Sequence, residues 1–286
     1  FCFNFYYQLF ISIYNFIINN HKYPYEITII NTKYWFLPYK KGFIANETKS
    51  IKSSVFDCLN GRVLTYEDLK NEPYLNITKA KKDNYKRAIK CFNQYLKNTN
   101  SNHLSDERLA IAQVGLETYF ILFLFSTGMN DSTASTLMWN ENYTIEKEIP
   151  EFRNIKYRAG NKIVEFQIVS KLINLFKKFI NLRNYLLLDN SKNEYLFFQG
   201  YGENSYISTT SENGNLSSYI NSRISKIFNT NKLKCLSSRT IRLYKTKYLI
   251  KHHGIIQAAN VAQTRVTTFL KHYSEKKEET SSVQII

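Results

Sequence analysis

The chain has 286 residues, with 39 Lys and Arg against 23 Asp and Glu, which gives a formal net charge of +16. With 43% hydrophobic and 15% aromatic residues, it can bury one large core or two smaller ones, which excludes a disordered chain. The charge favours DNA, RNA or an anionic membrane as a partner, although a bias toward AT-rich codons also raises the lysine count. The four cysteines form no CxxC pair, which argues against a zinc ribbon or disulfide framework and fits a reducing cytosol.

The first 20 residues are apolar, and their apolar side chains recur every three or four positions. Four polar residues interrupt this run and no basic segment precedes it, so the pattern predicts a buried helix rather than a membrane span or signal segment. The chain begins with Phe1 rather than Met, as expected of a fragment or a processed form. Residues 274–286 are charged and then small, which is typical of a frayed or exchangeable tail.

Residues 22–75 alternate short apolar runs with turn formers, which predicts a small mixed or helical region. A helical pattern follows from residue 78, with one apolar face made of Tyr85, Ile89, Phe92 and Leu96. The next helix, over 106–127, is apolar enough to lie at the centre of a core. Ser105 is placed to cap its start, and Gly128 is placed to end it in a left-handed turn.

A β-hairpin is predicted at 152–169, where FRNIKYR and KIVEFQIV flank the turn AGN. Helical patterns recur after it, at 171–188, 216–231, 237–253, 254–263 and 266–275. The predicted fold class is therefore mainly α with a small β-hairpin or three-stranded sheet (α+β). No GxxxxGK[ST], GxGxxG or HExxH motif occurs, and adjacent His252 and His253 diverge on a helix, so neither a cofactor nor a metal is expected.

Several stretches, taken in order, resemble the catalytic domain of the tyrosine recombinases, the phage-integrase family. They are FLFSTGMNDSTASTLMW (123–139), KYRAGNKIVEFQI (156–168), FINLRNYLLL with EYLFF, SSRTIRLYKTKYL (237–249) and AANVAQTRVTTFLKHYSE (258–275). The wording TGMN and RAGNK resembles a divergent bacterial branch of integrase-like proteins. The resemblance implies a recombinase catalytic domain over 100–286, and a divergent or truncated core-binding region over 1–99, which together clamp double-stranded DNA.

In that family a tyrosine hydroxyl attacks a DNA phosphodiester, giving a 3′-phosphotyrosyl link and a free 5′-hydroxyl without a metal or cofactor. Guanidinium groups stabilise the charge that gathers on the phosphate oxygens, and a Lys or His protonates the leaving oxygen. The covalent link conserves the bond energy for rejoining. The resemblance therefore implies a recombinase that acts as a dimer to tetramer on DNA in the bacterial cytoplasm or nucleoid, away from membranes.

Mapped onto this sequence, Tyr273 matches the nucleophile and Arg242 matches the Arg of the family's His-x-x-Arg motif. Arg239 stands where that His would be, on the same helical face. Lys156 matches the hairpin Lys, and its hairpin neighbours Arg158 and Lys162 are the alternatives. Three basic residues of the hairpin and the basic helix are expected to contact DNA: Arg158, Lys162 and Lys245.

Besides Arg239, two further positions depart from the family pattern. Asn130 occupies the place of the family's first Arg after TG, and Thr264 stands where a second His or a Trp is usual. Asn130 is equally well placed as a helix C-cap or turn residue, and Arg239 and Arg242 as solvated or phosphate-positioning side chains. Two alternatives to a recombinase therefore remain: an integrase-derived DNA-binding protein without catalysis, and a membrane-associated basic protein that uses residues 1–20.

Overall fold

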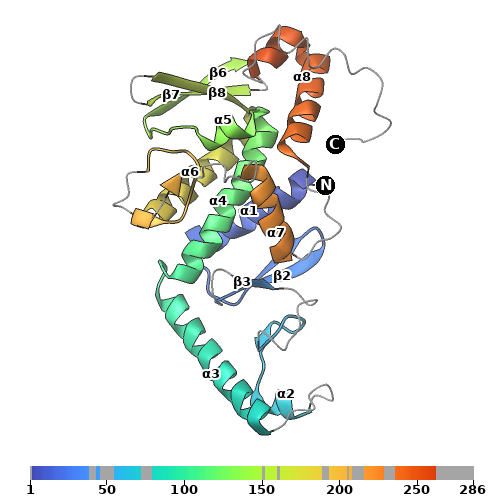
Figure 1. Cartoon of the computed structure of the whole chain (residues 1–286), viewed down its shortest axis with the longest axis vertical. Coiled ribbons are helices and arrows are strands. Elements are labelled where there is room, and N and C mark those ends of the chain that lie inside the picture. Colours follow the sequence, from blue (N-terminus) through green and yellow to red (C-terminus); the bar gives the residue numbers. More distant parts are fainter. Residues whose placement is uncertain are drawn as a thin grey trace.

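The computed structural model describes residues 2–38, 43–45, 55–71, 79–149, 152–159, 162–188, 193–204, 206–207, 216–228 and 236–261. Within these residues long helices are combined with small antiparallel sheets (Figure 1), as expected for the α+β class. The recombinase fold itself remains a prediction.

The helices are α1 (Cys2–Ile18), α2 (Tyr66–Asn71), α3 (Lys79–Ser101), α4 (Asp106–Thr127), α5 (Asp131–Ser135), α6 (Ile173–Leu187), α7 (Leu216–Phe228) and α8 (Ser238–Val261). The 3-10 turns are η2 (Ser170–Leu172) and η3 (Gly202–Asn204). The strands are β1 (Tyr25–Ile29), β2 (Thr32–Leu37), β3 (Phe43–Ala45), β4 (Phe56–Asp57), β5 (Arg62–Val63), β6 (Tyr143–Ile149), β7 (Phe152–Ala159), β8 (Lys162–Val169), β9 (Phe198–Gln199) and β10 (Tyr206–Ile207).

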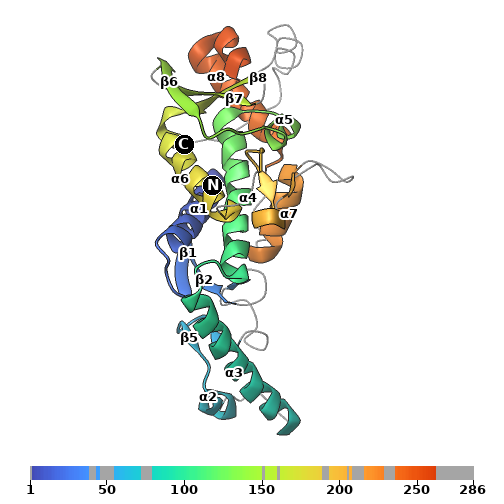
Figure 2. The same ribbon diagram turned by 90° about the vertical axis from the view of Figure 1, so that its left-hand side faces the viewer.

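Helix α4 runs through the middle of the protein, and α1, α6 and α7 lie around it (Figures 1 and 2). Its central Tyr119 stacks on Phe179 of α6, with ring centroids 4.2 Å apart, and lies 5.2 Å from Phe10 of α1. A Cβ at Gly115 would lie 2.7 Å from a methyl carbon of Leu182 and 2.8 Å from one of Ile13. The glycine therefore allows the three helices to approach closely.

The prediction that the first residues form a buried helix is confirmed. Seven residues of α1 are buried, and they belong to the same hydrophobic core as the residues of α4 and α6. Helix α4 is the one helix, among the residues described, that is long and apolar enough to cross a membrane. Since 89% of its most apolar stretch is buried inside the protein, it lies where a core helix does.

The region at 22–75, predicted as mixed or helical, contains strands. β1, β2 and β3 form an antiparallel sheet, and Trp35 and Leu37 of β2 belong to a second hydrophobic cluster that includes Phe92 of α3. The predicted apolar face of α3 is confirmed, because its remaining members pack against the same cluster. Leu96 also packs against the main core, so it joins the two clusters. The main core draws residues from both sides of positions 99 and 100. The division of the chain into two domains at that point remains a prediction.

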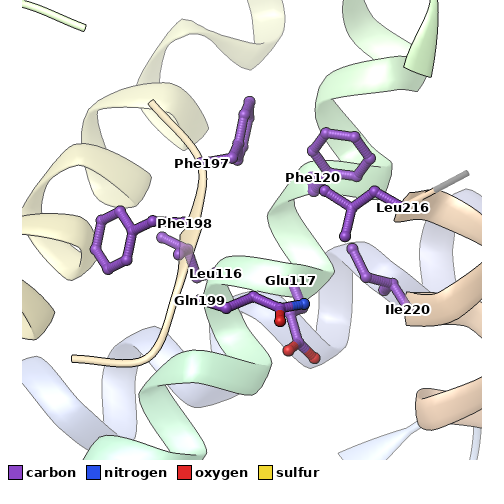
Figure 3. A pocket seen from close by; sticks show the side chains of 8 residues that line it. All are labelled: Leu116, Glu117, Phe120, Phe197, Phe198, Gln199, Leu216 and Ile220. Carbon is purple, nitrogen blue, oxygen red and sulfur yellow. The ribbon is translucent and has the colours of Figure 1, made fainter. Parts of the chain in front are cut away.

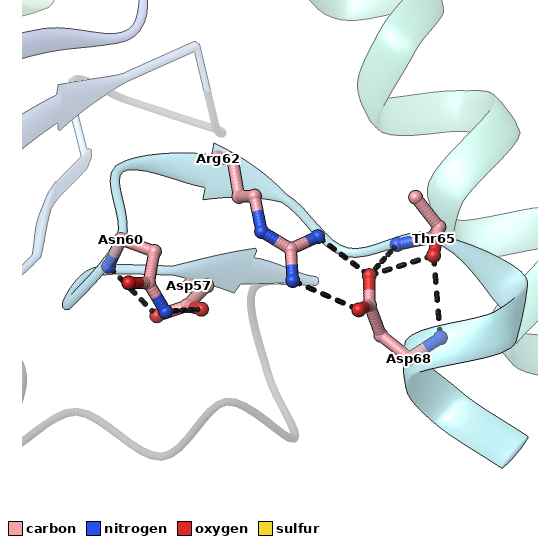
Figure 4. Close-up of polar contacts among 5 residues, drawn as sticks. All are labelled: Asp57, Asn60, Arg62, Thr65 and Asp68. Atoms are coloured by element: carbon pink, nitrogen blue, oxygen red, sulfur yellow. Dashed lines mark hydrogen bonds and ion pairs between the residues drawn. The ribbon is translucent and has the colours of Figure 1, made fainter. Parts of the chain in front are cut away.

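A polar network connects the β4–β5 hairpin to the start of α2 (Figure 4). Thr65 and Asp68 form a capping box, in which the Asp68 amide donates to the Thr65 hydroxyl (3.2 Å) and the Thr65 amide donates to the Asp68 carboxylate (2.7 Å). Arg62 donates to both carboxylate oxygens, at 2.6 and 2.8 Å, and these hydrogen bonds hold the pKa of Asp68 well below its usual range. We interpret this network as a local fold element, because its donors and acceptors satisfy one another.

The junction between α3 and α4 is held by a buried arginine. Arg108 is 1% exposed, and its guanidinium donates to the backbone oxygens of Thr99 (3.3 Å) and His21 (2.6 Å). Its charge also lies over the rings of Phe16 and Tyr23. As predicted, Ser105 caps α4 by accepting from the Arg108 amide. The hydrogen bonds and ring contacts of Arg108, together with the Ser105 cap, therefore fix the junction between α3 and α4.

The predicted hairpin is confirmed, and it forms part of the three-stranded sheet β6–β7–β8. Along β7, Ile155 and Tyr157 are buried, whereas Lys156 is half-buried and Arg158 is exposed. Buried residues of β8 lie on the inward face too, and Phe166 meets Phe123 of α4 edge-on at 5.2 Å. One face of the sheet therefore packs on α4, and the other carries polar and charged residues.

Helix α8 combines the two helical segments predicted at 237–253 and 254–263. Ser237 caps it, accepting from the Thr240 amide at 3.1 Å. Gly254 breaks its helical geometry, with φ of 79° and ψ of 169°, so the segments meet at a kink. The polar segment 200–215 contains η3 and the short strand β10, which pairs with β9.

Candidate functional site

The site implied by the sequence begins where α4 ends, at the residues Thr127 and Gly128. Gly128 has a φ of 69°, in the left-handed region, and its amide donates to the oxygen of Leu124, as predicted for a helix C-cap. Two elements flank this turn: β8, through the contact of Phe123 with Phe166, and α8, through the contact of Gly128 with Lys245. Three of the stretches that carry the family resemblance therefore meet at the end of α4.

Three cations lie on one side of α8 in a graded order. Arg239, Arg242 and Lys245 follow one another at intervals of three residues, so at about 100° per residue each lies about 60° from the next around the helix. Arg239 is exposed, Arg242 is half-buried and Lys245 packs on Gly128. The row thus runs from the solvent to the turn at the end of α4.

Lys245 lies on the inward stripe of α8, between the buried side chains of Ile241 and Leu249. Its Cγ lies 3.1 Å from the position that a Cβ would take at Gly128. Burial of the ammonium lowers the pKa of Lys245 to about 8, because a charged group is poorly solvated there. Lys245 was predicted from the sequence as a DNA contact, and its inward position was not predicted. The signal for that position is its spacing of four residues from both Ile241 and Leu249.

The cations of the hairpin occupy the outer face of the sheet. Lys156 and Arg158 alternate with the buried Ile155 and Tyr157, so their side chains lie opposite the face that packs on α4. Lys156 is paired across the strands with Glu165, an arrangement that also suits a simple cross-strand charge pair. Lys162 begins β8, and its side chain lies outside the described residues. The convergence of these cations with Arg242 on one surface remains a prediction.

Asn130 lies at the start of α5 rather than at the end of α4. Asn130 occupies the N-cap position of α5. Its side chain is exposed and makes no capping hydrogen bond. The C-cap of α4 is Gly128, so the alternative of Asn130 as that cap is wrong. The next residue, Asp131, is 1% exposed and accepts from the backbone amide of Ser217 at 3.0 Å. The Asp131 carboxylate is thus held at the start of α7, where the helix dipole favours it.

Tyr273 and Thr264 lie outside the described residues, as does most of the stretch 258–275. Its first residues, Ala258 and Ala259, belong to α8 and are fully buried. The assignment of Tyr273 as the nucleophile therefore stays a prediction.

A second site lies against the middle of α4 (Figure 3). It is a small pocket, partly open to the solvent and with room for roughly one water molecule, lined by Leu116, Glu117, Phe120, Phe197, Phe198, Gln199, Leu216 and Ile220. Glu117 is 3% exposed, and one of its carboxylate oxygens accepts from Arg223 of α7. Burial raises the pKa of Glu117 to about 7, against the lowering effect of the Arg223 charge. We interpret the pair as a buried link between α4 and α7.

The Glu117 pair was not found from the sequence, although a signal for it was present. A single carboxylate within the apolar run of residues 109–125 has no polar face to lie on, so it needs a buried partner. Within the described ranges, no group of three or more His, Cys, Asp or Glu side chains is placed to hold a metal ion.

Comparisons with known proteins add no identification. No protein-family model, no curated protein and no solved structure matches the chain.

Proposed function

We propose that the chain is a site-specific DNA recombinase or integrase, which breaks and rejoins DNA through a 3′-phosphotyrosyl intermediate. The observation that carries the proposal is the position of the basic row of α8 beside the turn at Gly128. This turn, the β8 strand and α8 are the elements in which the sequence resembles the tyrosine recombinases, and they lie together. The net charge of +16 supports a DNA partner.

In this proposal each charged group acts on one phosphodiester. The Tyr273 hydroxyl releases its proton to the solvent as its oxygen attacks the phosphorus, the bond to the 5′-oxygen breaks, and a hairpin cation such as Lys156 gives a proton to that oxygen. Arg242 and Arg239 stabilise the negative charge on the non-bridging oxygens. The reaction takes place on double-stranded DNA in the bacterial cytoplasm or nucleoid, in an assembly of two to four copies, and uses no cofactor.

A nicked suicide substrate tests the proposal, because loss of a short 5′ product traps the covalent protein–DNA adduct. We expect Tyr273→Phe to abolish the adduct and leave the Kd for DNA nearly unchanged, since one hydroxyl contributes little beside many phosphate contacts. Tyr248→Phe, which alters an exposed tyrosine of α8, is the matched control and should form the adduct normally. An adduct with Tyr273→Phe would show that another residue is the nucleophile.

The second candidate function is a DNA-binding protein derived from an integrase and without catalysis. Asn130 favours it, because a neutral amide stands where the family has a guanidinium. The two functions share the DNA-binding prediction: affinity should fall steeply between low and physiological salt. A nearly flat dependence of affinity on salt would argue against both, whereas salt-dependent binding without an adduct, even on synapsed substrates, would favour the second.

A further inference from the structure

The strongest departure from the family pattern is the loss of positive charge at residue 130, next to the turn at Gly128. A phosphate bound by Arg242 and Arg239 would still lack the cation that the family places beside the turn. Arg239 is exposed at the far end of the row, and Lys156 lies on the outer face of the sheet. A nearer cation reaches the Gly128 turn from α8, and it is Lys245.

We propose that Lys245 supplies the positive charge that is missing at Asn130, and that it binds the reacting phosphate of DNA together with Arg242. The inference rests on the proposed function, because that function defines the phosphate. The observation that supports the inference is the packing of the Lys245 side chain on Gly128, where the Lys245 Cγ lies 3.1 Å from the position that a Cβ would take. Gly128 and residue 130 are two positions apart, so their Cα atoms are at most about 7 Å apart.

Lys245 therefore reaches the neighbourhood of residue 130 from a different helix. Its Cγ lies on the turn, and the ammonium stands three bonds further along the side chain. Arg242 is one helical turn earlier on α8, so the two cations are neighbours on the helix surface. The nearest acidic residue in sequence to Asn130 is Asp131, and one of its carboxylate oxygens accepts from the amide of Ser217 at the start of α7.

The position of Lys245 also differs from that of an ordinary surface lysine. Lys251 of the same helix is exposed, whereas Lys245 stands on the inward stripe between two buried apolar residues. The ammonium of a lysine placed there loses part of its solvation. A cation partly withdrawn from water interacts more strongly with a phosphate than a fully solvated one does.

The experiment moves the charge between the two positions. Lys245→Met removes the ammonium and keeps an unbranched stem against Gly128, and Asn130→Arg restores a guanidinium at the position where the family has it. Lys251→Met is the matched control on the exposed face. The rate of adduct formation on the nicked substrate and the salt dependence of DNA affinity are measured for each, after circular dichroism has established that the variants are folded.

We expect Lys245→Met to slow adduct formation by about 10²- to 10³-fold, the usual effect of removing one such stabilising group. The double variant with Asn130→Arg should regain most of that rate, and Lys251→Met should match the unmutated protein. The slope of log K against log salt should also become shallower by about one in Lys245→Met.

A Lys245→Met variant that reacts at the unmutated rate would overturn the inference, as would a double variant that is no faster than Lys245→Met. These outcomes differ from failure of the proposed function, in which the unmutated protein forms no adduct at all. In that case the salt slope still decides: an unchanged slope in Lys245→Met excludes the phosphate contact, and a shallower one with recovery by Asn130→Arg supports it.

Discussion

The position of Lys245 makes a quantitative prediction about stability in the absence of DNA. Burial lowers its pKa from 10.5 to about 8, and each pKa unit corresponds to about 1.4 kcal/mol. Holding the ammonium on the inward stripe therefore costs about 3 kcal/mol at pH 7, where the folded and unfolded states both carry the charge. We expect Lys245→Met, which has no charge to bury, to be more stable at pH 7 by up to about this amount.

The difference should depend on pH in a defined window. Between about pH 8 and pH 10.5 the unfolded protein still binds the lysine proton and the folded protein has lost it, so stability rises with pH in the unmutated chain. The advantage of Lys245→Met should shrink across this window. Titration of the 22 tyrosines occurs in both proteins and largely cancels in the comparison.

Urea unfolding followed by circular dichroism, at pH values from 6 to 10.5, measures this difference. Lys251→Met is the control, and its stability should differ little from that of the unmutated protein at any pH, because Lys251 is exposed. The reasoning would be refuted if Lys245→Met were less stable at pH 7, or if its advantage were the same at every pH.

Three further predictions concern the core. Burial raises the pKa of Glu117 to about 7, so between about pH 4.5 and 7 the unfolded protein has lost this proton and the folded protein still binds it. The free energy of unfolding should therefore fall as the pH rises across that range in the unmutated chain, and fall much less in Glu117→Gln. Urea unfolding at a series of pH values measures this. Gly115→Ala should cost about 1 to 3 kcal/mol, seen as a lower Tm, since its Cβ would clash with side chains of α1 and α6. Arg108→Met should lower the free energy of unfolding in urea by about 3 kcal/mol or more, because it leaves the backbone oxygens of Thr99 and His21 without their donor. The control Lys33→Met, which removes an exposed ion pair, should lower it by less than about 1 kcal/mol.

The helices could be predicted where the sequence carries both periodicity and end signals. α4 begins at a Ser105 cap and ends at a left-handed Gly128, and these local rules hold whatever surrounds the helix. The strands β1 to β3 could not be predicted, because short apolar runs suit a buried strand and a buried helix equally well. Their pairing depends on residues distant in the sequence, which periodicity does not report.

The candidate site was predictable as a set of residues and not as a geometry. Arg239 and Arg242 follow from spacing on one helix, but the rotation of α8 against α4 decides which lysine meets the turn at Gly128. That rotation is set by the packing of Ile241 and Leu249, so Lys245 was named as a DNA contact without its inward place. The family resemblance and the role of Tyr273 remain predictions.

The length of α3 amplifies any change of angle at its junction with α4. Helix α3 has 23 residues, so at 1.5 Å per residue it extends about 34 Å from the junction that Arg108 holds. A rotation of about 10° there would move the far end, beside α2, by about 6 Å. Small changes of angle at this junction would therefore be amplified into displacements of several ångströms at the distal end, so the contacts of Arg108 fix where the start of α3 lies.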